Sequence, residues 1–272
     1  MKDITEKEFD KIRAHVKELF GINLGDEKRS LVYSRLRGVL QEQGLTDFSE
    51  YYKYLKNDKT GKATTVFIDK ITTNHTFFMR ESDHFDIFRD KALPFIKEEY
   101  GKQKDLRLWC AACSSGEESY TLQMIVQDFF KNDPGWNIEM LATDISTTVL
   151  DKAVHGVYSN ESVSTLPKDW QQKYFKPHET GTSIVVDSVK NKITYRKFNL
   201  MEDKFPFKKK FQIIFCRNVM IYFDAETRDT LVSKFYDLTE PGGYLFIGHS
   251  ESLNHTGTKF KYISPATYRK EK

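Results

Sequence analysis

A chain of 272 residues is long enough for one large α/β domain together with a small second one. With 39% hydrophobic and 30% charged residues it has the composition of a soluble globular protein, and no apolar run approaches the roughly 18 residues of a membrane span. A net charge of +3 is too small to indicate nucleic acid by itself, and the first residues lack the apolar stretch of a secretory signal. We therefore expect a cytoplasmic protein that does not insert into a membrane.

The first part of the chain carries only helical patterns. Thr5 and Glu8 resemble a capping box, and apolar residues follow at helical spacing over Phe9–Phe20. A second run, Lys28–Arg37, is amphipathic with a cationic face. We expect an all-α N-terminal domain over residues 1–65.

The cationic face of this second run has two interpretations. Its charges suit an acidic partner or a phosphate backbone, but such a run is more often a solvated helix face. The neighbouring acids Asp26 and Glu27 count against nucleic acid. The partner-binding hypothesis concerns Lys28, Arg29, Arg35 and Arg37.

Residues 66–100 show further helical patterns on both sides of Thr72–Glu81, a segment dense in hydroxyl and amide side chains that also contains Arg80. From residue 101 strand and helix patterns alternate, which predicts a mainly parallel, doubly wound sheet. The alternation lapses over about residues 157–192, where we expect an inserted helix and a small antiparallel β-subdomain. Two short β-like runs stand near Ser183–Asp187 and Ile193–Phe198, after which the doubly wound pattern resumes. The expected strands of that pattern are Leu106–Ala112, Ile138–Thr143, Phe211–Cys216 and Tyr244–Gly248, with a β-like pair around Phe260–Arg269.

The most informative stretch, Leu106–Glu118, joins the first expected strand to a helix through a loop of small residues. In an open α/β sheet, ligands bind at such a loop, at the carboxyl end of the strand. Glu117 and Glu118 occupy the first helical turn, where they would repel a phosphate but suit a cationic or hydroxyl-rich ligand. S-adenosylmethionine, with a sulfonium and an α-ammonium group, is a ligand of this kind.

Cys110 and Cys113 form a CxxC motif within the same stretch. A redox motif usually places both sulfurs at the start of a helix, whereas Cys110 falls in the strand pattern. A zinc site would need a second ligand pair, and Cys216 has no such partner nearby. We expect these cysteines to pack as small residues in a reducing compartment, and we expect no metal site.

Polar residues follow two further strands. Asp144 ends the second strand, where a carboxylate can accept hydrogen bonds from both ribose hydroxyls; the alternative is that it caps the next helix. Asn199 follows the Ile193–Phe198 strand, and its amide suits an adenine edge, with an ordinary turn as the alternative. Their position at the sheet edge, together with Glu117, favours ligand binding.

A buried strand leads directly into Arg217 and Asn218 and then to Tyr222. This places the three residues at the binding edge of the sheet, although a surface ion pair for Arg217 and ordinary packing for Tyr222 are the alternatives.

Arg80 and Tyr222 suggest a reaction. If a methyl group passes to a glutamate carboxylate, the acceptor is already ionised at neutral pH and needs no general base. An arginine fork and a tyrosine hydroxyl would hold it in line with the methyl group. An acceptor that starts protonated would need a base, and His75 and His249 keep that possibility open.

Five segments in fixed order resemble the CheR-type methyltransferases of bacterial chemotaxis, and the resemblance covers essentially the whole chain. They are Thr73–Glu81, Trp109–Glu118, Ala142–Ser146, Phe215–Phe223 and Gly248–Glu251. The resemblance implies a Rossmann-like S-adenosylmethionine-dependent methyltransferase domain over residues 101–272, with a helical linker at 66–100 that contributes cofactor-site residues. It also implies methyl transfer to glutamate side chains of chemoreceptor cytoplasmic domains, which yields glutamyl methyl esters and S-adenosylhomocysteine and serves chemotactic adaptation.

The resemblance also implies roles for single residues. Arg80 and Tyr222 lie closest to the methyl transfer, and the basic helix looks like the family's receptor-facing surface, which suits glutamate-rich receptor helices. The implied cofactor contacts are Asn74, Thr76, Arg80, Glu117, Asp144, Asn199, Leu200, Arg217 and Asn218.

The chain departs from the family pattern at one place. Some members dock a receptor's C-terminal peptide on the β-subdomain through a glycine-rich loop with arginines, but His178–Lys192 has one glycine and no arginine. We therefore expect direct recognition of the receptor helices. Separately, we expect a monomer that binds no nucleic acid. The alternatives are a methyltransferase of RNA or a small molecule with His75 or His249 as base, and a non-catalytic cofactor-binding adaptor that tolerates loss of Arg80.

Overall fold

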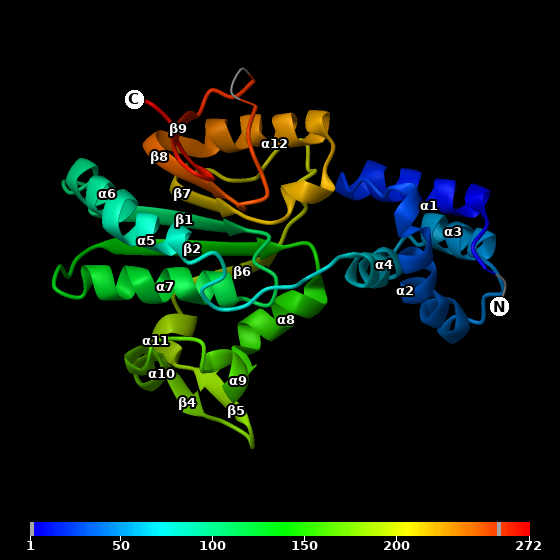
Figure 1. The fold of residues 1–272 in the computed structure, drawn as a ribbon, viewed down its shortest axis with the longest axis horizontal. Helices are drawn as coiled ribbons and strands as arrows, with labels where there is room; N and C mark the ends of the chain where they lie inside the picture. Colours follow the sequence, from blue (N-terminus) through cyan, green and yellow to red (C-terminus); the bar gives the residue numbers. More distant parts are fainter. Residues whose placement is uncertain (1–2, 255–256) are drawn as a thin grey trace.

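The central sheet of the computed structural model has the strand order β6-β2-β1-β7-β8-β10-β9 (Figure 1). The structure describes residues 3–254 and 257–272. Neighbouring strands from β6 to β8 run parallel, whereas β10 is antiparallel to both β8 and β9. The strands are β1 (Asp105–Ala111), β2 (Asn137–Asp144), β6 (Ile193–Lys197), β7 (Phe211–Cys216), β8 (Thr239–Ile247), β9 (Lys261–Ser264) and β10 (Thr267–Arg269).

The order of the strands creates a switch point at β1. The chain passes from β1 to β2 on one side and later returns to β7 on the other side. The loops after β1 and β7 therefore diverge at the carboxyl ends of the parallel strands, which leaves room for a ligand there. The expected mainly parallel α/β sheet is confirmed.

Helices cover both faces of this sheet because β1 is apolar on both sides. Leu108 and Cys110 belong to one buried cluster with α5, α6 and α7, whereas Trp109 and Ala111 belong to another with α12. Figure 1 shows α7 and α12 on opposite faces. The helices of this domain are α5 (Asp83–Ile87), the π-helical turn η2 (Phe88–Ala92), α6 (Leu93–Glu99), α7 (Glu117–Phe130), α8 (Thr147–His155) and α12 (Ala225–Leu238).

The N-terminal helices form a separate core beside the carboxyl edge of the sheet (Figure 1). Thr5 and Glu8 make the expected capping box. The expected boundary at residue 65 falls inside the last helix, whose Phe67, Ile68 and Ile71 are buried in this same core. The helical unit thus extends to Ile71. Its elements are α1 (Glu6–Phe20), η1 (Asp26–Lys28), α2 (Arg29–Glu42), α3 (Phe48–Asn57) and α4 (Lys62–Ile71).

The expected insertion is a three-stranded antiparallel sheet of order β3-β5-β4. It lies next to α7 and α8, away from the N-terminal helices (Figure 1). None of the described helices is long and apolar enough to cross a membrane. The elements of the insertion are β3 (Val157–Ser159), α9 (Asn160–Val163), α10 (Lys168–Tyr174), β4 (Phe175–Pro177), β5 (Thr182–Val185) and α11 (Asp187–Lys190).

Candidate active site

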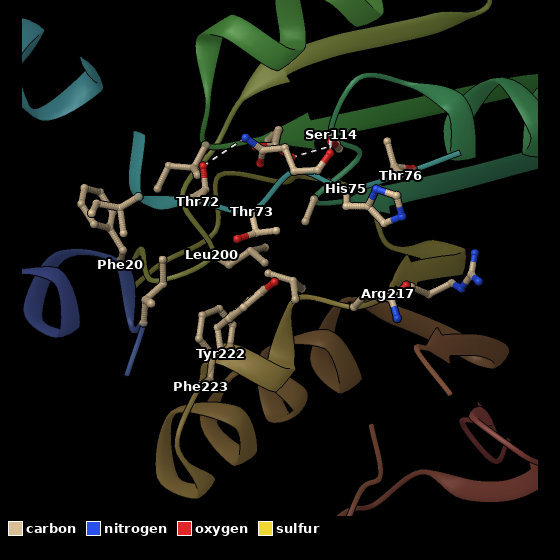
Figure 2. A pocket seen from close by; sticks show the side chains of 18 of the residues that line it. Phe20, Thr72, Thr73, His75, Thr76, Ser114, Leu200, Arg217, Tyr222 and Phe223 are labelled. Atoms are coloured by element: carbon tan, nitrogen blue, oxygen red, sulfur yellow. Dashed lines mark hydrogen bonds between the residues drawn. The ribbon is translucent and has the colours of Figure 1, made fainter. Parts of the chain in front are cut away.

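A cavity lies between the carboxyl edge of the sheet and the N-terminal helices. One wall, here the sheet-edge wall, consists of residues that follow β1, β2, β6 and β7: Ala112–Ser114, Asp144–Ile145, Phe198–Leu200 and Arg217–Val219. The facing wall combines Phe20, Ile22–Leu24 and Lys28 with the connector, residues 72–81, which carries Arg80. Figure 2 shows the side chain of Tyr222 pointing across the cavity toward the connector.

Most of the residues predicted from the sequence meet at this cavity. Both predicted catalytic residues, Arg80 and Tyr222, line it. Of the nine predicted cofactor residues, eight line it, which are Asn74, Thr76, Arg80, Asp144, Asn199, Leu200, Arg217 and Asn218.

Glu117 is the exception. It is buried at the start of α7, where its Oε2 accepts a hydrogen bond from Ser115 Oγ at 2.8 Å, and burial raises its pKa. The next residue, Glu118, lines the cavity instead. Successive residues of a helix point about 100° apart, so the two carboxylates face different directions. Glu118 is the first-turn carboxylate that lines the cavity, and a cofactor contact for Glu117 stays a prediction.

Asp144 is held at the end of β2 by backbone groups. Its two oxygens accept from Ser114 N–H at 2.8 Å and Ser146 N–H at 3.0 Å. Burial raises the pKa of Asp144, and these hydrogen bonds oppose that shift. Ser146, not Asp144, caps α8 through Val149 N–H. The capping alternative is therefore wrong, and the carboxylate keeps acceptor positions for further hydroxyl donors.

Asn199 lines the cavity and also binds two backbone groups with its amide. Its Nδ2 donates to the carbonyl of Leu19 at 2.8 Å, and its Oδ1 accepts from Met201 N–H at 3.0 Å. Each end of the amide keeps one further hydrogen-bonding position, so pairing with an adenine edge stays a prediction. The residue ties the end of α1 to the sheet-edge wall.

Arg217 lies in a buried ion-pair network with the connector. Its guanidinium contacts Glu118 Oε2 at 2.7 Å and Glu81 Oε2 at 3.0 Å, and it donates to the carbonyl of Arg80. Asn218 Nδ2 donates to the other Glu81 oxygen at 2.9 Å. Burial disfavours the Glu81 carboxylate, but these hydrogen bonds and the Arg217 charge prevail and lower its pKa to about 2. This network fixes the connector, and with it Arg80, on the sheet edge.

Sequence reasoning missed two acidic residues that hold the site together. One is Glu81. The other is Glu251, which is buried and accepts from the N–H groups of Gly248, Asn218 and Ile221. Both lie inside segments that carry the family resemblance, Thr73–Glu81 and Gly248–Glu251, and this position was the sequence signal that could have identified them.

Backbone strain concentrates around the same cavity. Among the described residues other than glycine, seven have positive φ, and five of these lie at the site. Such conformations cost on the order of 1–3 kcal/mol each and persist where the surrounding structure enforces them. The five are Met79, Glu81, Ala112, Ser114 and Asn218, with φ between 49° and 67°.

The two histidines that could act as general bases in the alternative mechanism lie in different places. His75 lines the cavity, and its carbonyl accepts from Arg80 Nη1 at 2.7 Å; His249 does not line it.

Within the described part of the chain, His249, His84 and Glu81 have possible metal-ligand atoms within 4.8 Å of one another. Burial, together with the Arg217 and His249 charges, lowers the pKa of His84 to about 3. The Arg217 guanidinium already contacts Glu81 Oε2, and its positive charge would repel a metal cation bound to that carboxylate.

The predicted partner-binding cations divide into two groups. Lys28, Arg29 and Arg37 are exposed, and Lys28 also lines the cavity. Arg35 is half-buried, and its guanidinium donates to the carbonyls of Ile71 and Thr72 and to Thr73 Oγ1. Because Arg35 is engaged with the start of the connector, it is the least accessible of the four cations, and its partner-binding role stays a prediction.

All three cysteines are buried and free, and burial raises the pKa of each thiol. Cys110 Sγ donates to Glu118 Oε1 at 3.2 Å. The expected packing role is therefore confirmed.

The chain matches the models of two domains of one known protein family. The model of the CheR methyltransferase all-alpha domain matches residues 7–72, and that of the CheR methyltransferase SAM binding domain matches residues 74–269. The chain belongs to the CheR methyltransferase family. A chemotaxis protein methyltransferase of Borreliella burgdorferi is 42% identical over 98% of this chain and 95% of its own length. Those of Escherichia coli and Pseudomonas putida (Cher2) are 36% and 34% identical, over 97% and 91% of this chain and 91% and 90% of their own lengths.

The cofactor of this CheR methyltransferase is accordingly S-adenosylmethionine, as expected from the sequence. The cavity fits that molecule chemically. Asp144 has acceptor positions for ribose hydroxyls, and the Glu118 carboxylate, whose charge Arg217 already balances, lines the same space. The loop from Ala112 to Glu118 contains no lysine or arginine for a phosphate.

Proposed function

We propose that this CheR methyltransferase methylates glutamate side chains on the cytoplasmic helices of chemoreceptors. The products are glutamyl methyl esters and S-adenosylhomocysteine, and the reaction serves adaptation in the cytoplasm. The observation that carries the proposal is the position of Arg80 and Tyr222 on one cavity whose carboxylates are already engaged. Glu118 is paired with Arg217, and Asp144 is held by two backbone N–H groups, so neither is placed as a free general base.

The proposed mechanism needs positioning and charge complementarity. When bound, S-adenosylmethionine supplies an electrophilic methyl group on its sulfonium. Arg80 uses Nη1 on the His75 carbonyl and has further N–H donors for an incoming carboxylate. The hydroxyl of Tyr222 holds one carboxylate oxygen, and the other attacks the methyl carbon in line. No proton is transferred because the glutamate enters ionised.

We propose a glutamate-rich receptor helix as the partner because exposed cations stand beside the cavity. Lys28 lines the cavity, and Arg29 is exposed next to it at the start of α2. Opposite charges on the receptor would speed the encounter and orient the helix. Relatives named chemotaxis protein methyltransferase support this choice. The arginine-free β4–β5 segment favours recognition of the helix over capture of a tail peptide. We propose that the chain acts as a monomer.

Incubation with radiolabelled S-adenosylmethionine and a receptor cytoplasmic fragment tests the proposal. We expect label on the receptor that is released by mild base, as an ester requires, and no label with a fragment whose methylation-region glutamates are changed to glutamine. Base-stable label, or label transferred to added RNA instead, would sink the proposal. Retention of activity in His75→Ala and His249→Ala would separate it further from base-dependent methylation.

A further inference from the structure

The end of α1 touches the segment that carries Tyr222. Lys17 Nζ lies 2.7 Å from Asp224 Oδ2, and Asn23 N–H donates to the carbonyl of Tyr222 at 2.8 Å. Ile22 and Phe223 form an isolated antiparallel bridge. Three consecutive residues, 222 to 224, are therefore each held by the N-terminal helical domain.

Gly21 makes this close contact possible. It ends α1 in the left-handed region, with φ of 68°, and its N–H donates to the carbonyl of Lys17. A Cβ at this position would lie 2.4 Å from Met201 Sδ and 3.0 Å from Thr227 Cγ2. Glycine adopts this left-handed backbone without strain and leaves space for the Met201 side chain, and the resulting turn sends the chain alongside Tyr222.

Asp224 has two separate tasks at this junction. One oxygen, Oδ1, accepts from Thr227 N–H at 2.9 Å and caps α12, while the other pairs with Lys17. On its N-terminal side Tyr222 belongs only to the short 3₁₀ turn η3 (Met220–Tyr222). The C-terminal side of the tyrosine is thus set by the cap and by the contacts from α1.

We propose that Lys17 and Asp224 are positioning residues that set the place of the Tyr222 hydroxyl in the cavity. The inference rests on the proposed catalytic role of Tyr222. The helical domain then does more than present cations to a receptor, because it also completes the geometry of the transfer site. Displacements of about 1 Å at a reacting group can cost about 100-fold in rate, so even a half-exposed ion pair has a measurable effect here.

Two substitutions separate the ion pair from the cap. Asp224→Asn keeps an efficient N-cap but loses the charge, since asparagine and aspartate are nearly equivalent caps. Lys17→Met removes the other partner. Lys11→Met, on an exposed position of the same helix, is the matched control. We expect kcat with the receptor fragment to fall about threefold to tenfold in both variants, and no further in the double variant.

The dissociation constant of S-adenosylhomocysteine should stay within about twofold of wild type, because the sheet-edge wall is untouched. Hydrogen exchange at the Asn23 amide should be faster in both variants by about threefold or more, since its acceptor is the Tyr222 carbonyl. Unchanged kcat, or an equal loss of S-adenosylhomocysteine affinity, overturns the inference. If wild-type protein fails to methylate the receptor, the proposed function is overturned instead. In that case the exchange rate of the Asn23 amide still tests the inference by itself, because an unchanged rate in the two variants would show that the Lys17–Asp224 pair does not position the Tyr222 segment.

Discussion

The two walls of the cavity differ in how they are held. On the sheet-edge wall Asp144 and Arg217 are 7% and 5% exposed and are fixed by backbone N–H groups and buried ion pairs. On the facing wall the connector shares that network, but the part contributed by the helical domain depends on contacts between domains, such as Lys17–Asp224, whose side chains are 54% and 27% exposed. Buried, well-connected groups hold a site more rigidly than exposed ones. The cofactor half and Arg80 are therefore preorganised, while the Tyr222 side of the acceptor half depends on how the helical domain docks.

The largest effect, on the free energy of unfolding, is expected at Glu81, where the connector meets the sheet-edge wall. Glu81→Gln should lower the free energy of unfolding at neutral pH by about 3 kcal/mol, because it takes a charged partner from the buried Arg217. The folded-state pKa of Glu81 is lowered from 4.5 to about 2, so its contribution is complete above about pH 4.5 and is lost as the pH falls through that window.

Urea unfolding of both proteins at several pH values measures this difference. The gap between wild type and Glu81→Gln should narrow from about pH 5 toward pH 3. Glu161→Gln, on an exposed position of α9, is the control and should match wild type throughout. A gap that does not depend on pH would contradict the assigned pKa of Glu81.

The second effect tests the facing wall. Arg80→Ala should lower kcat at saturating cofactor by about 100-fold, or about 2.7 kcal/mol, because the guanidinium holds the acceptor carboxylate. Arg80→Lys keeps the charge without the planar fork and should recover only part of the rate. Steady-state methylation of a receptor fragment provides the measurement, and a large rise in the cofactor KM with unchanged kcat would assign Arg80 to cofactor binding.

The third effect tests the sheet-edge wall by itself. Asp144→Asn should weaken S-adenosylmethionine binding about tenfold, which corresponds to about 1.4 kcal/mol, while kcat at saturation stays within about threefold. Calorimetric titration with S-adenosylhomocysteine measures the affinity. A loss of kcat comparable to that of Arg80→Ala would erase the distinction between the two walls.

The smallest effects distinguish two arginines of α2. Arg37→Met should raise the receptor KM about twofold and leave stability unchanged, as expected for an exposed charge. Arg35→Met should lower the free energy of unfolding by about 1 kcal/mol, because the carbonyls of Ile71 and Thr72 lose a charged donor. Equal stability of the two variants would show that Arg35 does not anchor the connector.

The sequence predicted the sheet and its ligand edge well because strand ends are local features. Asp144 and Arg217 each follow an apolar run, and parallel topology brings such positions together. The choice between Glu117 and Glu118 depends on where a helix starts, and one residue changes the facing side chain. The contact of Asn199 with the Leu19 carbonyl joins positions 180 residues apart, and no local pattern reports it.

The connector gives the cofactor domain a wall that lies outside its own alternating strands and helices. Ser114 Oγ donates to the carbonyl of Asn74 at 3.0 Å, so this wall is fastened directly to the loop after β1. Recombination that moves the sheet to a new protein would have to carry residues 72–81 with it. A replacement for the helical domain would also need a chain turn that meets Tyr222. The unit that can be inherited intact is therefore larger than the sheet and its helices.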